Sequence, residues 1–309
     1  MTDRSDSPSI GLVGCGRWGS LILRDLRSLG ARVDVMVPSD RNREELLAAG
    51  ASRVVTKLDE LQTADGIVVA SPTVTHADVL DTVVDFGVPV FVEKPMTCDA
   101  ARAADLAARA PDRLFVMDKW RYHAGVLAIR DRVAAGDIGT PQAIRTRRVQ
   151  WGSPHDDVDC TWILLPHDIS IAYEVLGSIP EPVWARAFGP ADRPLGLEGA
   201  AELPDGVWMH FRVGITSPEH DRRIEVVGDD GSLVLGGGWD EEIVLTRTSG
   251  AEADVRTIPA AGELPLLAEL RTFVDHLAGG PPPLSSAATG AAIVGCIAAA
   301  RDLAGLPST

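Results

Sequence analysis

The stretch GLVGCGRWGSLILRDLRSLGARVDVMVPSDRNREEL, residues 11–46, decides the fold of the first part of the chain. Gly14, Gly16 and Gly19 stand between a short apolar run and a helical pattern. In such a unit the first glycine permits a tight turn, the second lets the backbone approach a pyrophosphate, and the third allows close helix-strand packing. The N-terminus of the helix also attracts phosphate. The stretch therefore predicts a dinucleotide site, with Arg17 and Trp18 as further residues of its loop.

The end of the second expected strand bears on the choice of dinucleotide. An NAD site usually carries an acid about twenty residues after the glycines, where it accepts hydrogen bonds from the ribose hydroxyls. Here the strand ends in Val37-Pro38-Ser39, and Asp40, Arg41 and Arg43 follow. A serine hydroxyl and an arginine can bind a 2′-phosphate, so we expect NADP, with Ser39, Arg41 and Arg43 near that phosphate. The alternative that stays open is NAD, with Asp40 on the ribose.

Composition narrows the class of partner to a small-molecule substrate. The chain has 309 residues and a formal net charge of -15, which argues against nucleic acid or an anionic membrane as a partner. The N-terminus MTDRSDSPS has no apolar segment, and no apolar run approaches the roughly 18 residues of a membrane span, so we expect a cytoplasmic protein. The four cysteines lack metal-ligand spacing, and His155 beside Asp156 and Asp157 favours a solvated turn. No metal site is expected.

The apolar runs divide the chain into two parts. In residues 1–120 short apolar runs alternate with helical patterns, which is typical of a parallel sheet covered by helices. From residue 139 onward, short strands separated by Gly, Pro and Asp turns favour a mainly antiparallel sheet. The expected strands are 10–13, 33–37, 54–55, 67–70, 90–92 and 114–117, then 143–151, 183–188, 207–213, 223–227, 232–235 and 243–246. The fold class is thus α/β plus α+β, with domains at 1–120 and 121–309, and the second contains helices expected at 161–176, 264–277 and 286–303.

A longer motif occupies residues 67–96, IVVASPTVTHADVLDTVVDFGVPVFVEKPM. One apolar run ends at Ser71-Pro72, His76 opens a helical pattern, and the next apolar run ends at Glu93-Lys94-Pro95. Two further segments are GDIG at 136–139 and PHDIS at 166–170. Together these motifs resemble the Gfo/Idh/MocA family, which includes glucose-fructose oxidoreductase and inositol dehydrogenase, over most of the chain.

The resemblance implies a Rossmann domain that binds the dinucleotide and a second domain that binds substrate and self-associates into a homodimer or homotetramer. Hydride transfer at a carbinol or carbonyl carbon also needs a proton moved at the oxygen. In the family the lysine of Glu-Lys-Pro lies beside nicotinamide and substrate and the helix histidine is the acid/base, which implies these catalytic roles for Lys94 and His167. The same resemblance places four further residues near the cofactor, namely Ser71, Pro72, His76 and Glu93.

For the substrate, the resemblance points to three segments. The end of the first domain lies under the nicotinamide in the family. The strand after GDIG leads into the pocket in the family, so an arginine of this strand is a candidate to hold a carboxylate or phosphate, and the open alternative is a solvated or interface face of the strand. The loop before the helix of His167, residues 151–162, is rich in polar and aromatic residues, so we expect a lid or specificity element there. The candidates in these segments are Trp120, Arg121, Tyr122, Arg147, Trp151 and Trp162.

One position departs from the family pattern. Many members carry an aspartate one helical turn before the histidine, and here that position is Ile163. Residues four apart share a helix face, so an apolar side chain enters the expected pocket. We expect NADPH-dependent reduction of a sugar-like ketone. The open alternatives are an imine or less polar carbonyl reductase, and a dinucleotide sensor without catalytic activity.

Overall fold

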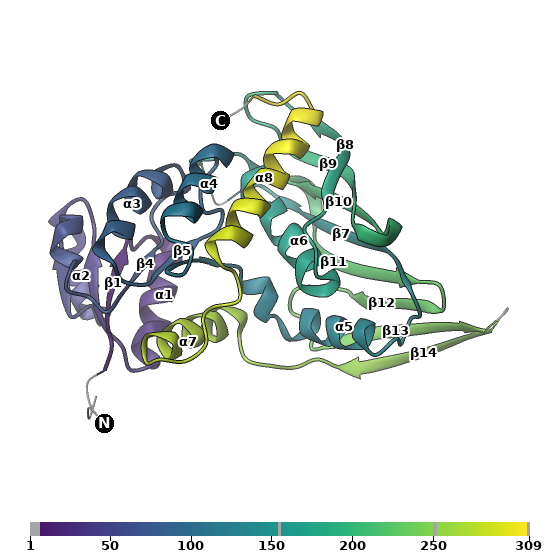
Figure 1. The fold of residues 1–309 in the computed structure, drawn as a ribbon, viewed down its shortest axis with the longest axis horizontal. Helices are drawn as coiled ribbons and strands as arrows, with labels where there is room; N and C mark the ends of the chain where they lie inside the picture. The colour runs from purple at the N-terminus through teal and green to yellow at the C-terminus, as the bar shows by residue number, and fades with distance from the viewer. Residues whose placement is uncertain (1–6, 154–155, 250–251, 308–309) are drawn as a thin grey trace. The chain divides into compact units, whose positions relative to one another are not determined.

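The computed structural model describes residues 7–153, 156–249 and 252–307 of the chain (Figure 1). The chain forms two compact units. The first comprises Met1–Lys119 with Leu266–Ala291, and the second comprises Trp120–Pro265 with Ala292–Thr309. The division expected from the sequence, at residue 120, assigns 266–291 to the second domain, whereas in the structure this segment belongs to the first unit. His155 lies outside the described residues.

The first unit contains a parallel sheet with the strand order β3-β2-β1-β4-β5-β6. Its strands are β1 (Ser9–Val13), β2 (Arg32–Met36), β3 (Arg53–Val55), β4 (Gly66–Val69), β5 (Val90–Glu93) and β6 (Leu114–Met117). Its helices are α1 (Arg17–Ser28), α2 (Arg43–Ala48), α3 (His76–Val83), α4 (Ala100–Arg109) and α7 (Pro265–Leu277). The strand order reverses between β1 and β4, and in open α/β sheets ligands bind at the carboxyl ends of the strands at such a point.

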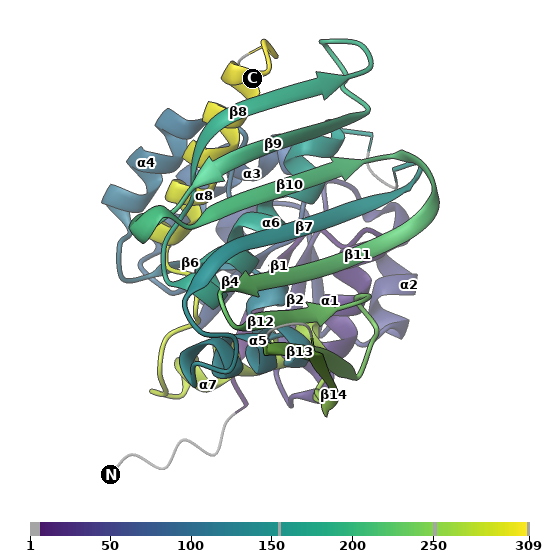
Figure 2. The same cartoon turned by 90° about the vertical axis from the view of Figure 1, so that its right-hand side faces the viewer.

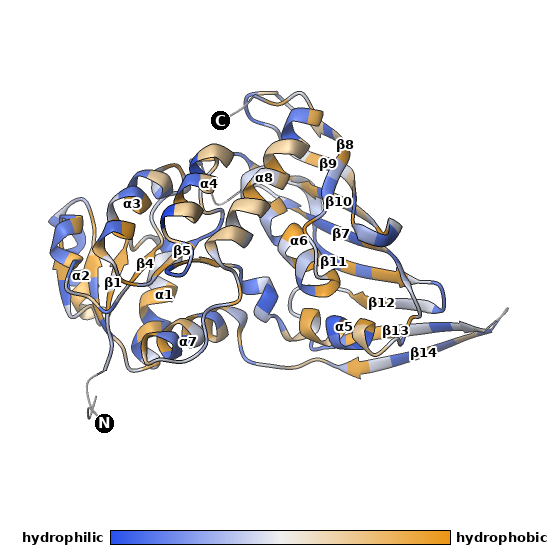
Figure 3. Ribbon diagram, viewed as in Figure 1, coloured by the Kyte–Doolittle hydropathy of each residue, from blue (hydrophilic) through white to orange (hydrophobic). Residues whose placement is uncertain are grey.

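The core of the first unit explains why 266–291 belongs to it. The strands β1, β4 and β5 are apolar almost throughout and are buried (Figure 3), as parallel strands covered on both faces should be. Helix α7 adds Leu266, Leu270 and Phe273 to this core, and the ring of Phe273 stacks on that of Phe91 at 5.1 Å. The apolar period of α7 predicted a helix correctly, but the period cannot show which sheet the helix covers.

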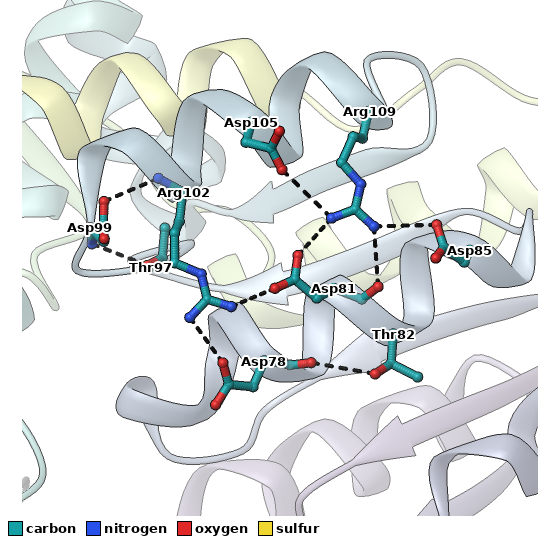
Figure 4. A network of polar contacts seen from close by, with 9 residues as sticks. All are labelled: Asp78, Asp81, Thr82, Asp85, Thr97, Asp99, Arg102, Asp105 and Arg109. Carbon is teal, nitrogen blue, oxygen red and sulfur yellow. Dashed lines mark hydrogen bonds and ion pairs between the residues drawn. The ribbon is translucent and has the colours of Figure 1, made fainter.

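Helices α3 and α4 are joined at the surface by a network of ion pairs (Figure 4). Arg102 contacts Asp78 at 2.9 Å and Asp81 at 2.5 Å, and Arg109 contacts Asp81 at 2.6 Å. Asp99 accepts hydrogen bonds from the first backbone N–H groups of α4 and thereby caps the helix. Because these groups are exposed, the network stabilises the pairing of the helices only modestly.

The second unit is built on a sheet with the order β14-β13-β12-β11-β7-β10-β9-β8 (Figure 2). Its neighbouring strands are antiparallel except for β7 and β10. The strands are β7 (Pro141–Trp151), β8 (Glu181–Phe188), β9 (Gly196–Glu202), β10 (Trp208–Gly214), β11 (Thr216–Gly228), β12 (Gly231–Leu235), β13 (Glu242–Ser249) and β14 (Glu252–Pro259). The expected fold class, α/β plus a mainly antiparallel α+β domain, is confirmed.

Helices α5 (Ala124–Ala134) and α6 (Cys160–Leu176) pack against this sheet, α6 on β7 and β10 and α5 on β12 and β13. Helix α6 is buried almost all round, which agrees with its apolar sequence. Helix α8 (Ala287–Leu303) is divided between the two units. Within the described residues, we find no helix with the length and apolar character that spanning a membrane requires.

Candidate active site

The glycine loop after β1 has the three properties that a pyrophosphate site requires. Gly14 has φ +87°, and a Cβ there would lie 2.7 Å from the backbone of Ser71, which follows β4. A Cβ on Gly19 would lie 2.5 Å from the carbonyl oxygen of Gly14, so only glycine lets α1 approach the turn. Gly16 faces open space. It is the N-cap residue of α1, and no side-chain hydrogen bond caps the helix there among the described residues. The first amides of the helix therefore remain available to a phosphate.

At the ribose end of the site, Asp40 and Arg43 form an ion pair. Asp40 is the candidate for the ribose hydroxyls of NAD, and Arg43 is a candidate for the 2′-phosphate of NADP. Strand β2 ends at Met36, and the backbone of Val37 continues the sheet by donating to Val55. The guanidinium of Arg43 donates to the carboxylate of Asp40 at 2.6 and 3.0 Å, and both side chains are exposed. An acid whose charge is already neutralised repels a 2′-phosphate less. Arg41 is exposed beside this pair.

His76 joins two of the loops at the carboxyl ends of the strands. The ring is 1% exposed, with Nδ1 at 2.9 Å from the carbonyl oxygen of Pro95 and Nε2 at 3.0 Å from that of Ser71. The histidine thus ties the loop after β4 to the Glu-Lys-Pro loop after β5. Its contacts are those of a residue that positions both loops, and Lys94 extends from the second loop as a half-buried side chain.

Glu93 links the Glu-Lys-Pro loop to the glycine loop. The indole N–H of Trp18 donates to its Oε1, and the backbone N–H of Lys94 donates to Oε2 at 3.1 Å. The ammonium group of Lys119 lies 4.4 Å from the centre of the Trp18 ring, a cation–π contact. Burial raises the pKa of the Glu93 carboxyl, and the charge of Lys94 opposes the shift. Carboxylate, lysine and indole are therefore held as a unit at the strand ends.

Glu269 is a residue of this cluster that the sequence analysis missed. Phe91 and Glu93 share one face of β5, and Glu269 lies one helical turn from Phe273 on α7. The stacking of Phe91 on Phe273 therefore brings Glu269 toward Glu93. The side chain is 0% exposed, and neither carboxyl oxygen has a hydrogen-bond partner among the described residues. Burial and the neighbouring Glu93 raise its pKa well above the usual value, so the group is held as a neutral acid. An acid on the apolar stripe of α7 was the available signal.

In the second unit, Trp120 and His167 come together. His167 lies on α6 and is 8% exposed. The indole of Trp120 stacks on His123 at 4.8 Å, and its centre lies 6.4 Å from that of His167. The guanidinium of Arg148 lies over the same indole at 4.4 Å and donates through Nε to Asp168 at 2.8 Å. A candidate acid/base thus borders an aromatic ring that a buried guanidinium group also covers.

The structure does not bring the other substrate candidates into this group. Arg147 lies on the opposite face of β7 and pairs with Asp221 at 2.8 Å, so the arginine that meets α6 is Arg148, one residue further along. Trp151, at 74% exposed, also lies on that outer face, whereas Trp162, at 1% exposed, is a core residue.

The three remaining substrate candidates are Arg121, Tyr122 and Ile163. Arg121 donates to Glu174 at 2.8 Å and covers the ring of Tyr173 at 4.7 Å, which gives it a structural role, and Tyr122 follows it in the chain. Ile163 is buried one helical turn before His167, as its position in the sequence implies.

Comparison with known proteins gives this arrangement its context. Residues 9–117 match the model of a protein family described as "Oxidoreductase family, NAD-binding Rossmann fold". Residues 126–234 match the model described as "GFO/IDH/MocA C-terminal domain". The chain belongs to the Gfo/Idh/MocA family. The resemblance that the sequence motifs indicate is confirmed, and the chain is an NAD(P)-dependent oxidoreductase.

Relatives in the Gfo/Idh/MocA family extend along most of the chain. The myo-inositol 2-dehydrogenase of Thermotoga maritima is 25% identical over 306 residues, which cover 91% of either chain. The myo-inositol dehydrogenase Hyg17 of Streptomyces leeuwenhoekii is 31% identical over 313 residues, covering 88% of this chain and 89% of the relative. Among solved structures, levoglucosan dehydrogenase in complex with NADH and levoglucosan superposes with a TM-score of 0.87 at 16% identity, covering 97% of this chain and 98% of that one. At 16% identity, the likeness to levoglucosan dehydrogenase shows a shared fold alone.

Proposed function

We propose that this family member transfers hydride between NADP and a hydroxyl- or carbonyl-bearing carbon of a sugar-like substrate, and that in the cell it reduces a ketone with NADPH. The observation that carries the proposal is the glycine loop, because Gly14 and Gly19 leave no room for a side chain while Gly16 faces open space. The names of the relatives, which are inositol dehydrogenases, support a polyhydroxylated substrate.

The residues present fit a dinucleotide. Backbone amides of the 14–19 loop would hold the pyrophosphate, and Ser39, Arg41 and Arg43 would hold the 2′-phosphate. When bound, the nicotinamide supplies or accepts the hydride. NADPH is usually kept reduced in cells, so selection of the 2′-phosphate favours the direction of ketone reduction.

The chain's own residues handle the substrate oxygen and its proton. Lys94 would orient and polarise the oxygen through its ammonium group, whose charge acts on the buried Glu93 carboxyl. His167 would exchange the proton of that oxygen, because imidazole titrates near neutral pH. The positioning residues for these two groups are His76, which fixes the loop of Lys94, and Trp120, which borders His167.

Cofactor choice is tested by titrating NADPH and NADH and following the fluorescence. Wild type is compared with Ser39→Ala, Arg41→Ala and Arg43→Ala. A preference for NADPH that falls at least about tenfold in one of the variants supports the 2′-phosphate site, since one charge-assisted contact is worth about 1.5–3 kcal/mol. Equal or tighter binding of NADH would indicate that Asp40 binds the ribose hydroxyls, and it would refute the NADP assignment.

The catalytic roles are tested by turnover of keto-sugars with NADPH and of polyols with the oxidised cofactor. Lys94→Ala and His167→Ala are each expected to lower kcat by about 10²-fold or more, while cofactor binding persists. Turnover that is unchanged in both variants would contradict the assignments. Cofactor binding without turnover of any carbonyl or carbinol would instead favour a dinucleotide sensor.

One observation favours a second candidate function. Ile163 places a buried apolar side chain one turn before His167, where a polyol hydroxyl finds no acceptor on this residue. A less polar carbonyl or a cyclic imine fits that surface better. NADPH turnover with a cyclic imine but not with keto-sugars would support this alternative, and the Ile163→Asp variant should then shift activity toward polyhydroxylated substrates.

We also propose that the protein is a homodimer or homotetramer that associates through the sheet of the second unit. Trp151, Trp184 and Trp208 are exposed on its strands at 74%, 51% and 38%, and exposed aromatic residues are enriched at protein interfaces. Sedimentation at micromolar concentration tests this, and a monomer would refute it.

A further inference from the structure

Two arginines face each other across neighbouring strands of the second unit. Arg148 on β7 is in direct register with Arg222 on β11. Like charges directly opposite each other on a sheet are unfavourable. The side chain of Arg148 is 2% exposed and that of Arg222 is partly buried, so water screens this repulsion poorly. Such a pair needs compensating negative charge.

The charge of this arginine pair is only partly compensated. Arg148 donates to Asp168 at 2.8 Å. Arg222 donates to the carbonyl oxygens of Val149 and Asp221 at 2.7 and 2.8 Å and to the side-chain oxygen of Gln150, all of which are neutral acceptors.

Among the described residues, the carboxylate next to Arg222 in the chain also serves another arginine. The Asp221 carboxylate pairs at 2.8 Å with Arg147, on the other face of β7. Burial and the charge of Arg148 lower the pKa of Arg222 to about 10, against the opposing effect of Asp168 and Asp221. In the group formed by Arg148, Arg222 and Asp168, two guanidinium groups therefore face one carboxylate, while Arg147 pairs with both Asp221 and Glu219.

The arginine pair adjoins the aromatic ring that borders the candidate acid/base. Arg148 covers the indole of Trp120, and the centre of that indole lies 6.4 Å from the centre of the His167 ring. A Cβ on Gly238 would lie 2.9 Å from Trp120 and 3.6 Å from Arg222 Cβ, so the glycine-rich turn 236–238 reaches both residues. The absence of a side chain there keeps the turn close to Trp120 and Arg222 without covering them further.

We propose that Arg222, supported by Arg148, binds an anionic group of the substrate, either a carboxylate or a phosphate. The substrate is then an acidic derivative of a sugar or polyol. This inference rests on the proposed function and names its substrate class. A guanidinium fork suits the paired oxygens of both anions, and an anion between the two arginines removes their repulsion. Ile163 agrees with it, because an aspartate there would add a negative charge one turn from His167.

The test compares three ligands with the same ring: glucose, glucuronate and glucose 6-phosphate. Binding of each is measured by calorimetry in the presence of saturating NADPH, for wild type, Arg222→Gln, Arg222→Lys and the control Arg223→Gln. Arg223 is the next residue of β11, is exposed and faces the other side of the sheet. Wild type and Arg223→Gln are expected to bind one of the anionic ligands at least about tenfold more tightly than glucose. Glucuronate or glucose 6-phosphate as the preferred ligand identifies the anion.

Arg222→Gln should lose this preference, and Arg222→Lys should retain part of it. Thermal unfolding of the ligand-free proteins gives an independent readout. Removal of one of two opposed charges should leave the unfolding temperature of Arg222→Gln equal to or above that of wild type, whereas a purely structural arginine would lower it. Equal binding of all three ligands to wild type, or an unchanged preference in Arg222→Gln, overturns the anion site. Failure of wild type to bind NADPH refutes the proposed function itself. Loss of the anion preference and loss of NADPH binding can be told apart, because Arg222 does not belong to the cofactor loop.

Discussion

Glu269 offers the sharpest test of the electrostatics in the first unit, through the variant Glu269→Gln. The native state holds its carboxyl neutral, because burial and Glu93 raise the pKa, although Lys119 and Lys94 oppose the shift. Above the ordinary glutamate pKa of about 4.3, the unfolded chain loses this proton while the native state keeps it. The stability that the neutral group contributes is therefore present at low pH and is lost as the pH rises toward the folded-state pKa.

The magnitude follows from the linkage between protonation and folding. Where the native state binds one proton more than the unfolded state, the free energy of unfolding falls by about 1.4 kcal/mol for each pH unit. A glutamine has nearly the same shape and cannot ionise, so this slope disappears in Glu269→Gln. Any cost of burying the amide is independent of pH, and the slope isolates the titration.

The assay is urea unfolding at several pH values between 5 and 8. The difference in unfolding free energy between Glu269→Gln and wild type should move in favour of the variant by about 1.4 kcal/mol per pH unit until the folded-state pKa is reached. The exposed Glu44 provides a matched control, and Glu44→Gln should follow wild type. Curves for Glu269→Gln and wild type that stay parallel from pH 5 to 8 would refute the reasoning, because Glu269 would then be ionised in the folded protein.

Three further outcomes are expected. Asp168→Asn leaves Arg148 buried without its ion partner, and this should lower the free energy of unfolding by about 3–5 kcal/mol; a loss below about 1 kcal/mol would show that the pair is not shielded from water. Arg102→Ala removes exposed contacts with α3 (Figure 4) and should cost no more than about 1 kcal/mol in the same assay. Burial raises the pKa of the Cys160 and Cys296 thiols to about 12, so both should resist alkylation at pH 8 in native protein and react after denaturation, as mass spectrometry of the peptides would show.

Local features of the first unit were accessible from the sequence because the chemistry needs particular residues at short spacing. The positive φ of Gly14 and the approach of Gly19 to the carbonyl oxygen of Gly14 belong to one strand-turn-helix unit, although Ser71 after β4 also closes the space around Gly14. The Glu-Lys-Pro motif likewise begins at the last residue of β5. Such features hardly depend on the rest of the fold, and the motifs that contain them were sufficient to indicate the family.

Two strands of the second sheet had no signal of their own. Strand β9, with the sequence GLEGAAE, is rich in small residues that disfavour strands, and it forms because β8 and β10 pair with its backbone on either side. Strand β14 is mostly polar and exposed and is held by its antiparallel pairing with β13. Tertiary pairing therefore overrides local preference in both elements.

The sequence by itself determined the glycine loop and the two-part architecture, because strand and helix periods and turn geometry are local properties. Only the tertiary structure decided that α7 completes the core of the first unit, that Glu269 reaches Glu93, and that Arg148 rather than Arg147 meets α6. Adjacent arginines on one strand leave the inward face undefined, and a one-residue change in assignment exchanges the two faces. The contacts between segments distant in the chain remove that ambiguity, since each buried charge must lie where another element supplies its partner.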